Sequence, residues 1–129
     1  MRIIEIKDKN HIEAFRKLPF KLYKNDPNWI PHLRQDVEAI FDPKQNKFFR
    51  HGEAIRWVLE NEHGEVIGRV AAFINEKVAN TFKQPTGGMG FFDCINDEKA
   101  AFKLLDTCKE WLEERGMKAM DGPINFGEK

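Results

Sequence analysis

The feature of this sequence that most constrains its fold is a strand–helix–strand pattern in the last third of the 129 residues. The apolar run from Met89 to Ile95 predicts a strand, and residues 97–115 predict an amphipathic helix. Gly116 is expected to end that helix in a left-handed conformation, and a second strand is predicted from Lys118 to Phe126. Because such a crossover normally joins parallel strands, the pattern predicts a sheet with a parallel pair covered by a helix.

The helix over residues 97–115 is predicted by the spacing of its apolar side chains. These recur one helical turn apart, at Ala101, Leu104, Leu105, Cys108, Trp111 and Leu112. Asp97 and Glu98 stand at its start, where carboxylates interact favourably with the helix dipole. We therefore expect one buried face against the sheet and an acidic first turn.

Two strands before this unit are predicted to form an antiparallel hairpin. Apolar residues alternate over residues 53–61, and His63-Gly64 suits a tight turn. The returning strand, residues 65–74, is apolar on both faces apart from Arg69. A strand that is buried on both faces is expected at the centre of its sheet.

The N-terminal part of the chain is predicted to add a strand and a helix. Residues 2–7 alternate weakly between apolar and polar, which favours a first strand. Asn10 is expected to cap a helix that runs to about Leu18. Pro19 is then expected to break or restart it, since proline lacks a backbone N–H.

Three further stretches are less regular. Turn residues surround Trp29, which either anchors a loop in the core or lines a ligand groove. Residues 32–41 predict another helix, and the connection over residues 75–89 has helical content at 76–82. The order of elements predicts an α+β fold, an α/β sandwich. Its mixed sheet is mostly antiparallel, with the parallel strand–helix–strand unit at the C-terminal end.

Charge and composition exclude several classes of function. Lys+Arg and Asp+Glu each total 21, so no net field attracts nucleic acid or an anionic membrane. No apolar run approaches the roughly 20 residues that a membrane span needs, and no secretion signal begins the chain. The two cysteines fit free thiols in a reducing cytoplasm, and the histidines lack metal-ligand spacing. We expect a cytoplasmic protein without metal, and the length suits one domain, residues 1–129.

Few residues carry recognisable chemistry. Serine is absent, which excludes serine catalysis. Asp93 lies inside an apolar strand, so its carboxylate faces solvent, pairs with a cation or belongs to a site. Cys94 is either a thiol activated by the following helix N-terminus or a small buried hydrophobe. Arg69 is expected to pair with a carboxylate or to extend to the sheet edge, Glu53 is a weaker candidate than Asp93, and Tyr23 is at most a substrate contact.

The pattern resembles the GNAT-type N-acetyltransferase fold. The hairpin from Gly64 to Ala71 is similar to the family's Gly-x-x-x-Gly opening of the third strand. The strand after it, the helix over residues 97–115 and the strand from Met117 to Phe126 correspond to the family's fourth strand, central helix and fifth strand. The segments 19–24, 26–31 and 116–126 resemble a GNAT-like group of bacterial proteins.

This resemblance implies an acyl-CoA-dependent N-acyltransferase that uses acetyl-CoA or another acyl-CoA and a small-molecule amine. In GNAT enzymes an acid on these strands serves as general base through water, which makes Asp93 the catalytic candidate. The coenzyme contacts expected at the strand end, the corner and the opening between the parallel strands are Cys94, Ile95, Asn96, Lys99 and Asn125.

The sequence departs from the family pattern in two ways, and these lead to an alternative function. The coenzyme loop of GNAT enzymes, Arg/Gln-x-x-Gly-x-Gly/Ala, is replaced by the shorter, glycine-free and acidic segment 95–101. This degenerate site favours a non-catalytic scaffold that supports a second domain or a dimer. A GNAT domain also continues past its fifth strand, so we expect a domain incomplete at its C-terminus and part of a longer protein with a second GNAT-like half. The exposed C-terminal edge strand would then pair with that half or with another copy.

Overall fold

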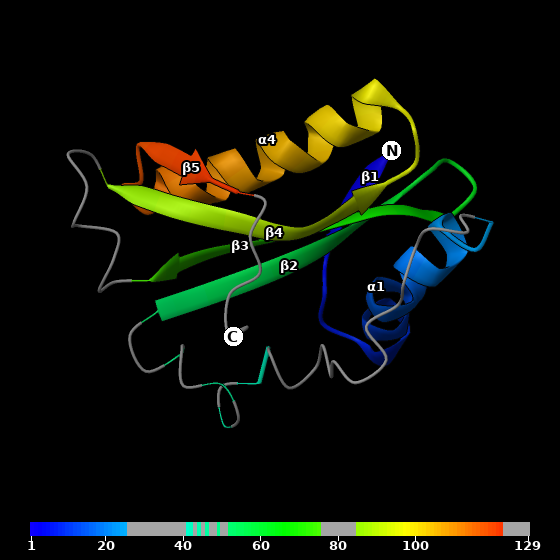
Figure 1. The fold of residues 1–129 in the computed structure, drawn as a ribbon, viewed down its shortest axis with the longest axis horizontal. Coiled ribbons are helices and arrows are strands. Elements are labelled where there is room, and N and C mark those ends of the chain that lie inside the picture. Colours follow the sequence, from blue (N-terminus) through cyan, green and yellow to red (C-terminus); the bar gives the residue numbers. More distant parts are fainter. Residues whose placement is uncertain are drawn as a thin grey trace.

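The computed structural model describes residues 1–25, 52–75 and 85–122, together with positions 41, 42, 44, 46 and 49. Its elements follow the order predicted from the sequence (Figure 1). They are β1 (Arg2–Glu5), α1 (Lys9–Leu22), β2 (Gly52–Glu60), β3 (Val66–Asn75), β4 (Thr86–Cys94), α4 (Glu98–Glu114) and β5 (Ala119–Asp121). The predicted helix over residues 32–41, the helical piece at 76–82, Trp29 and Asn125 lie outside the described residues.

The five strands form one sheet in the order β1-β2-β3-β4-β5. Every neighbouring pair is antiparallel except β4 and β5, which are parallel. Figure 1 shows α4 along one face of this sheet and α1 against the other. The predicted α+β fold with a mixed, mostly antiparallel sheet is therefore confirmed, as is the central position of β3.

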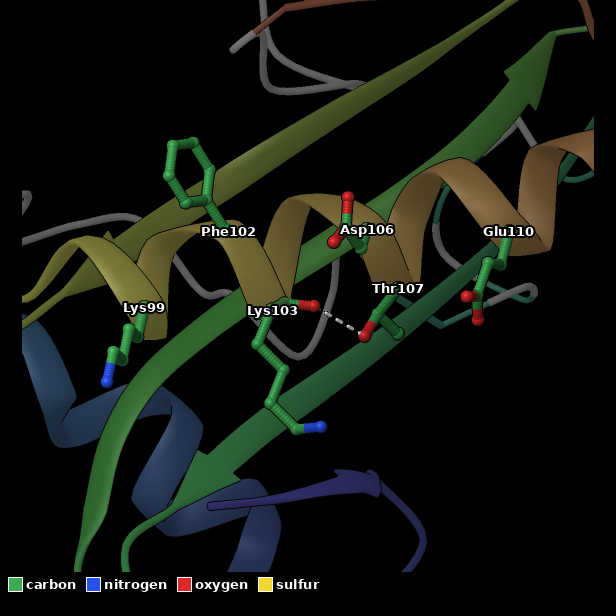
Figure 2. Close-up of a pocket in the computed structure, with 6 residues that line it drawn as sticks. All are labelled: Lys99, Phe102, Lys103, Asp106, Thr107 and Glu110. Carbon is green, nitrogen blue, oxygen red and sulfur yellow. Dashed lines mark hydrogen bonds between the residues drawn. The ribbon is translucent and has the colours of Figure 1, made fainter.

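Helix α4 is the element that the sequence predicted most closely. Asp97 accepts a hydrogen bond from the backbone N–H of Lys99 and caps the helix, and Gly116 ends it with φ of 82°. Its outward turns expose polar side chains and Phe102 (Figure 2). The inward stripe differs from the prediction, because Ala100 is buried whereas Ala101 and Leu105 are only partly so.

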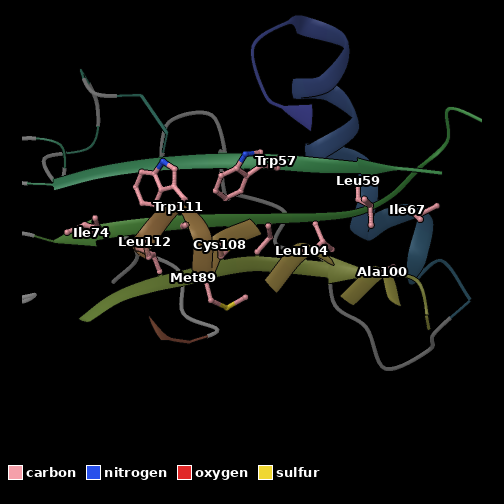
Figure 3. Close-up of a cluster of buried hydrophobic side chains, with 12 residues drawn as sticks. Trp57, Leu59, Ile67, Ile74, Met89, Ala100, Leu104, Cys108, Trp111 and Leu112 are labelled. Atoms are coloured by element: carbon pink, nitrogen blue, oxygen red, sulfur yellow. The ribbon is translucent and has the colours of Figure 1, made fainter. Parts of the chain in front are cut away.

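Two apolar clusters fill the space between the sheet and the helices. The larger one lies between α4 and the sheet (Figure 3) and consists of Trp57, Leu59, Ile67, Val70, Ala72, Ile74, Met89, Ala100, Leu104, Cys108, Trp111 and Leu112. The second lies under α1 and consists of Phe15, Val58, Ala71, Phe73 and Phe91. Phe41 and Phe49, from the connection after α1, pack against the second cluster. Both faces of the sheet are thus covered, which explains why β3 is apolar on both sides.

Helix α1 departs from the prediction at both ends. Its cap is Asp8, whose carboxylate accepts from the backbone N–H of His11, so the expected cap at Asn10 is wrong. Both residues suit a cap, but Asp8 lies three residues before the N–H that it binds. The helix continues through Pro19 to Leu22 instead of ending at Leu18. Packing of its apolar face outweighs the local cost of an internal proline.

Strand β4 begins at Thr86, three residues before the predicted start at Met89. Gly87 and Gly88 fall within the connection predicted over residues 75–89 but belong to the strand. Their neighbours leave no room for a side chain. A Cβ on Gly87 would lie 2.4 Å from Leu112, and one on Gly88 would lie 2.5 Å from the ring of Phe73. Glycine here allows the strand to pass between packed side chains.

A bulge interrupts β4 where it pairs with β3. Arg69 pairs with Asp93 and Ala71 with Gly90, so Phe91 and Phe92 both lie opposite Val70. Phe91 adopts a positive φ of 50°. Without the extra residue, alternation would turn Asp93 toward α4. With it, Phe91 packs in the cluster under α1, Phe92 packs toward α4, and Asp93 faces α1.

Candidate functional site

The most polar group in the interior is an ion pair between β3 and β4. Asp93 Oδ2 accepts a hydrogen bond from Nε of Arg69 at 3.0 Å, and Nη2 of Arg69 lies 3.0 Å from the same oxygen in an ion pair. The side chains are 9% and 17% exposed, respectively, for Arg69 and Asp93. Arg69 therefore pairs with a carboxylate, one of the two roles expected from the sequence. Burial of the guanidinium lowers the pKa of Arg69, and the charge of Asp93 opposes this shift.

Tyr23, at the end of α1, completes the environment of Asp93. Its hydroxyl donates to Asp93 Oδ1 at 2.7 Å, although the two residues are 70 positions apart in the chain. Both carboxylate oxygens are thus engaged. Burial raises the pKa of Tyr23 to about 12, and the hydrogen bond to Asp93 adds to this. The phenol consequently stays protonated and remains a donor at neutral pH.

The backbone of α1 is the third partner of Arg69. Nη1 of Arg69 donates to the carbonyl oxygen of Phe15 at 2.8 Å. In an uninterrupted helix that carbonyl accepts from the N–H four residues later. Here the residue four positions later is Pro19, which has no N–H. Arg69 supplies the donor that the proline lacks.

Cys94 lies next to Asp93 on β4 but on the opposite face, toward α4. Its thiol is half-buried and forms no disulfide. Burial raises the pKa of Cys94, and the nearby charges of Asp93 and Asp97 add to that effect. Of the two roles considered for Cys94 from the sequence, a small buried hydrophobe fits this environment better than an activated thiol, because burial and two carboxylates disfavour the thiolate.

The parallel strands β4 and β5 stay together only briefly. Among the described residues they pair at Thr86–Gly88 and Ala119–Asp121, and β4 then continues to Cys94 without β5 beside it. Gly122 follows β5 with φ of 143°, and a Cβ there would lie 2.4 Å from the carbonyl oxygen of Met89. Only glycine allows this close backbone approach. Among the described residues, β4 therefore extends past its pairing with β5, from Met89 to Cys94, and leads to α4.

The corner between β4 and α4 is a tight turn. The backbone N–H of Asp97 donates to the carbonyl of Ile95 at 2.7 Å, and Asn96 lies exposed between them. Asp97 also caps α4, so its carboxylate occupies the N–H groups that an anion would approach. Lys99 and Glu98 are both exposed in the first turn. The corner thus presents one positive and two negative side chains.

A shallow depression on the outer face of α4 is lined by one helix alone (Figure 2). Its residues are Lys99, Phe102, Lys103, Asp106, Thr107 and Glu110. Thr107 donates to the carbonyl of Lys103 within that helix. The charges of two lysines and two carboxylates cancel, so this surface offers no preference for a charged ligand. In the part of the chain that the structure describes, no group of side chains is arranged to hold a metal ion, and no helix is long and apolar enough to cross a membrane.

The structure brings together some of the residues predicted from the sequence. Asp93, Cys94 and Ile95 follow one another along β4 and its end, and Lys99 lies in the next helical turn. Glu53 lies elsewhere, where it accepts a hydrogen bond from Arg115 at 2.6 Å. Sequence reasoning missed the partnership of Tyr23 with Asp93. A buried carboxylate needs donors, and the single tyrosine was a candidate, but no local pattern joins them.

No family model matches the sequence. Two curated proteins are similar to it. YghO of Escherichia coli is 30% identical over 119 residues, which are 92% of this chain and 30% of that protein. A bacterial ceramide synthase of Caulobacter vibrioides is 33% identical over an alignment of 131 positions that covers 98% of this chain and 33% of that protein. The chain spans about a third of the length of these curated relatives.

Solved structures with the same architecture are GNAT-family acetyltransferases. A Staphylococcus aureus member has a TM-score of 0.58 at 16% identity, covering 92% of this chain and 69% of that one. An aminoglycoside acetyltransferase from a soil metagenome, in complex with sisomicin, has a TM-score of 0.62 at 14% identity, covering 97% and 78%. Glucosamine-6-phosphate N-acetyltransferase from Arabidopsis thaliana has a TM-score of 0.59 at 15% identity, covering 95% and 82%.

Proposed function

On the premise that this chain has the fold of GNAT-type N-acetyltransferases, we propose that it is the GNAT-like domain of an acyl-CoA-dependent N-acyltransferase. The acyl group would pass to the nitrogen of a small-molecule amine. The observation that carries this proposal is that, among the described residues, β5 pairs with β4 only at Thr86–Gly88, while β4 continues to Cys94. Where two parallel strands part, backbone N–H and C=O groups between them can pair with an extended molecule that carries amides. The pantetheine arm of coenzyme A is such a molecule.

The residues present fit the arm of the coenzyme better than its diphosphate. The part of β4 from Met89 to Cys94 would hold the arm, and Asn125, which lies outside the described residues, is a further contact proposed from the sequence. Ile95, Asn96 and Lys99 would lie near the diphosphate, where the start of α4 acts like about half a positive charge. Asp97 and Glu98 oppose this, because like charges about 4 Å apart repel by about 1 kcal/mol even in water. We therefore propose weak coenzyme binding at a degenerate phosphate site.

The coenzyme, when bound, supplies the acyl group as an activated thioester. The contribution of this chain would be to orient the amine and accept its proton. Asp93 is the proposed proton acceptor, through water, because its carboxylate is held by Arg69 and Tyr23 and is still partly accessible. Tyr23 donates to this carboxylate and orients it. Because the pKa of Tyr23 is raised to about 12, we do not assign it the role of proton donor to the leaving group.

The proposed function is tested by binding first and by transfer second. Coenzyme A at 100 times its dissociation constant should stabilise the fold by about 2.7 kcal/mol, measured as a thermal shift. Transfer is then measured by mass spectrometry of N-acyl products from acetyl-CoA and palmitoyl-CoA. Because one relative is named a ceramide synthase, sphinganine is the first acceptor to test, beside short primary amines. The control is Asp93→Asn, which should bind coenzyme A and lose most transfer.

The opposite outcome supports the alternative expected from the sequence. If millimolar coenzyme A and acetyl-CoA produce no thermal shift and no N-acyl product forms, the domain is a scaffold for a second domain or a dimer. The free edge of β5 would then be the surface to examine, since exposed edges pair with other chains. Light scattering after size-exclusion chromatography separates a monomer from a dimer.

A further inference from the structure

Pro19 lies inside α1 at the position where its missing N–H has a consequence on another element. The carbonyl of Phe15 would ordinarily be bound within the helix, and the proline ring also pushes against it. Nη1 of Arg69 takes this carbonyl at 2.8 Å. A proline in the helix therefore creates an acceptor on α1 for a side chain of β3.

The guanidinium of Arg69 is held on all sides by this arrangement. Nε and Nη2 bind Asp93, Nη1 binds Phe15, and the guanidinium carbon lies 4.8 Å and 5.6 Å from the ring centroids of Phe15 and Phe91. Five bonds or contacts on one rigid, planar group leave it a single orientation. The position of the Asp93 carboxylate follows from that orientation, and Tyr23 binds the remaining oxygen.

We propose that Pro19 and Arg69 are positioning residues for acyl transfer, Pro19 by making the Phe15 carbonyl available and Arg69 by fixing the Asp93 carboxylate against α1. This rests on the proposed function, in which Asp93 accepts the proton of the amine. An internal proline is unfavourable by about 3 kcal/mol relative to alanine in a helix interior. Stability alone would therefore not favour proline at position 19. Proline is useful there when the helix has to offer the Phe15 carbonyl to Arg69.

The discriminating variant is Pro19→Ala, which restores the N–H for Phe15 and lets the carbonyl turn back along the helix. We expect an unfolding temperature equal to or above that of the wild type, together with a kcat lowered about tenfold. KM for acyl-CoA should stay within about twofold, because the variant loosens the Asp93 side chain and leaves the backbone of β4, which would hold the coenzyme, in place. A variant that is more stable and less active separates positioning from mere support of the fold.

A second readout does not need turnover. Tyr23 is the only tyrosine, so the near-ultraviolet absorbance of tyrosinate reports on this one side chain. In the wild type its midpoint should lie near 12, and in Pro19→Ala it should move toward the ordinary value of 10.0 as the Asp93 carboxylate loosens. Arg69→Lys, which keeps the charge and loses the planar fork, should lower kcat in the same way. Asn10→Ala is the control, because it raises helix propensity in α1 without touching the Phe15 carbonyl.

Each outcome decides between the two proposals. Unchanged kcat and an unchanged tyrosine midpoint in Pro19→Ala would overturn the positioning role and leave the proposed function intact. Absence of any transfer by the wild type would overturn the proposed function. In that case a shifted tyrosine midpoint in Pro19→Ala still supports positioning of Asp93 by Pro19, and an unshifted midpoint overturns it.

Discussion

Arg69 and Asp93 are cross-strand partners in the ladder between β3 and β4; Arg69 faces α1 by the alternation of β3, and the bulge in β4 turns Asp93 to the same face. Neither residue is on α1, yet each is bound to it, Arg69 through the carbonyl of Phe15 and Asp93 through the hydroxyl of Tyr23. The pair thus joins three elements at one point. Its energetics lead to the first prediction.

Removal of one member of this pair should cost much more than removal of both. Arg69→Met leaves a largely buried carboxylate without a counter-charge and the Phe15 carbonyl without a donor, which we expect to destabilise the fold by about 3 kcal/mol. The double variant Arg69→Met/Asp93→Asn removes the stranded charge, and the amide oxygen can still accept from Tyr23. Urea denaturation of the two single variants and the double variant measures the coupling. Additive free-energy changes would contradict a direct interaction.

The stability of the fold should fall at alkaline pH through Tyr23. The pKa of Tyr23 is raised from 10.0 to about 12, so the folded state favours the protonated phenol. This contribution is fully present below pH 10 and is lost as the pH rises through about 12. Tyr23→Phe should remove that part of the pH dependence, measured by thermal unfolding from pH 9 upward. Asp93→Asn should lower the tyrosine midpoint only in part, because burial is the larger cause and remains.

The acidic start of α4 should weaken coenzyme binding measurably. Asp97→Asn keeps an oxygen that can cap the N–H of Lys99, and Glu98→Gln keeps the shape of the side chain. Each removes one negative charge, and we expect each to tighten coenzyme A binding about fivefold at low ionic strength, equivalent to about 1 kcal/mol. Isothermal titration calorimetry measures this.

The matched control for these two variants is Glu114→Gln, at the other end of the same helix. It removes the same charge about 25 Å away, where the Coulomb interaction is only about one-sixth of that at 4 Å even before salt screens it. The gain in coenzyme A affinity from Asp97→Asn and Glu98→Gln should also shrink as salt is added. An equal gain from Glu114→Gln would point to net charge and would argue against a phosphate site at the corner.

Gly122 should be less tolerant of a side chain than another glycine of positive φ. Gly64→Ala in the hairpin turn meets open space and should cost only the conformational strain, about 1–2 kcal/mol. Gly122→Ala adds a Cβ only 2.4 Å from the carbonyl oxygen of Met89, so β5 must move away from β4. We expect a larger loss of stability and weaker coenzyme A binding, by thermal unfolding and calorimetry. Equal losses in the two variants would show that the close approach at Met89 is unimportant.

How much of this could be predicted from the sequence differs between elements. Helix α4 was predicted almost completely, because its apolar period, its acidic start and Gly116 all report on the same local structure. The hairpin of β2 and β3 was predicted for similar reasons. Helix α1 was predicted too short, because propensity rules treat Pro19 as a boundary and cannot include a donor supplied from β3.

The candidate site was predicted as separate residues. Asp93 and Arg69 each stood out as a charge in an apolar strand, since burying a charge without a partner is costly. Their partnership depends on the register of β3 with β4, and Tyr23 joins them from 70 residues away. No pattern in the sequence encodes such a register, because it follows from packing on both faces of the sheet.

The sequence by itself determined the order of the elements, the mixed sheet and the acidic corner before α4, because these depend on local periodicity, turn chemistry and charge. Only the tertiary structure decided which face Asp93 occupies. The bulge at Phe91 reverses the alternation of β4, and the clusters under α1 and α4 hold that reversal in place. A single extra residue in a strand is invisible in a pattern with a period of two, yet it moves every following side chain to the other face.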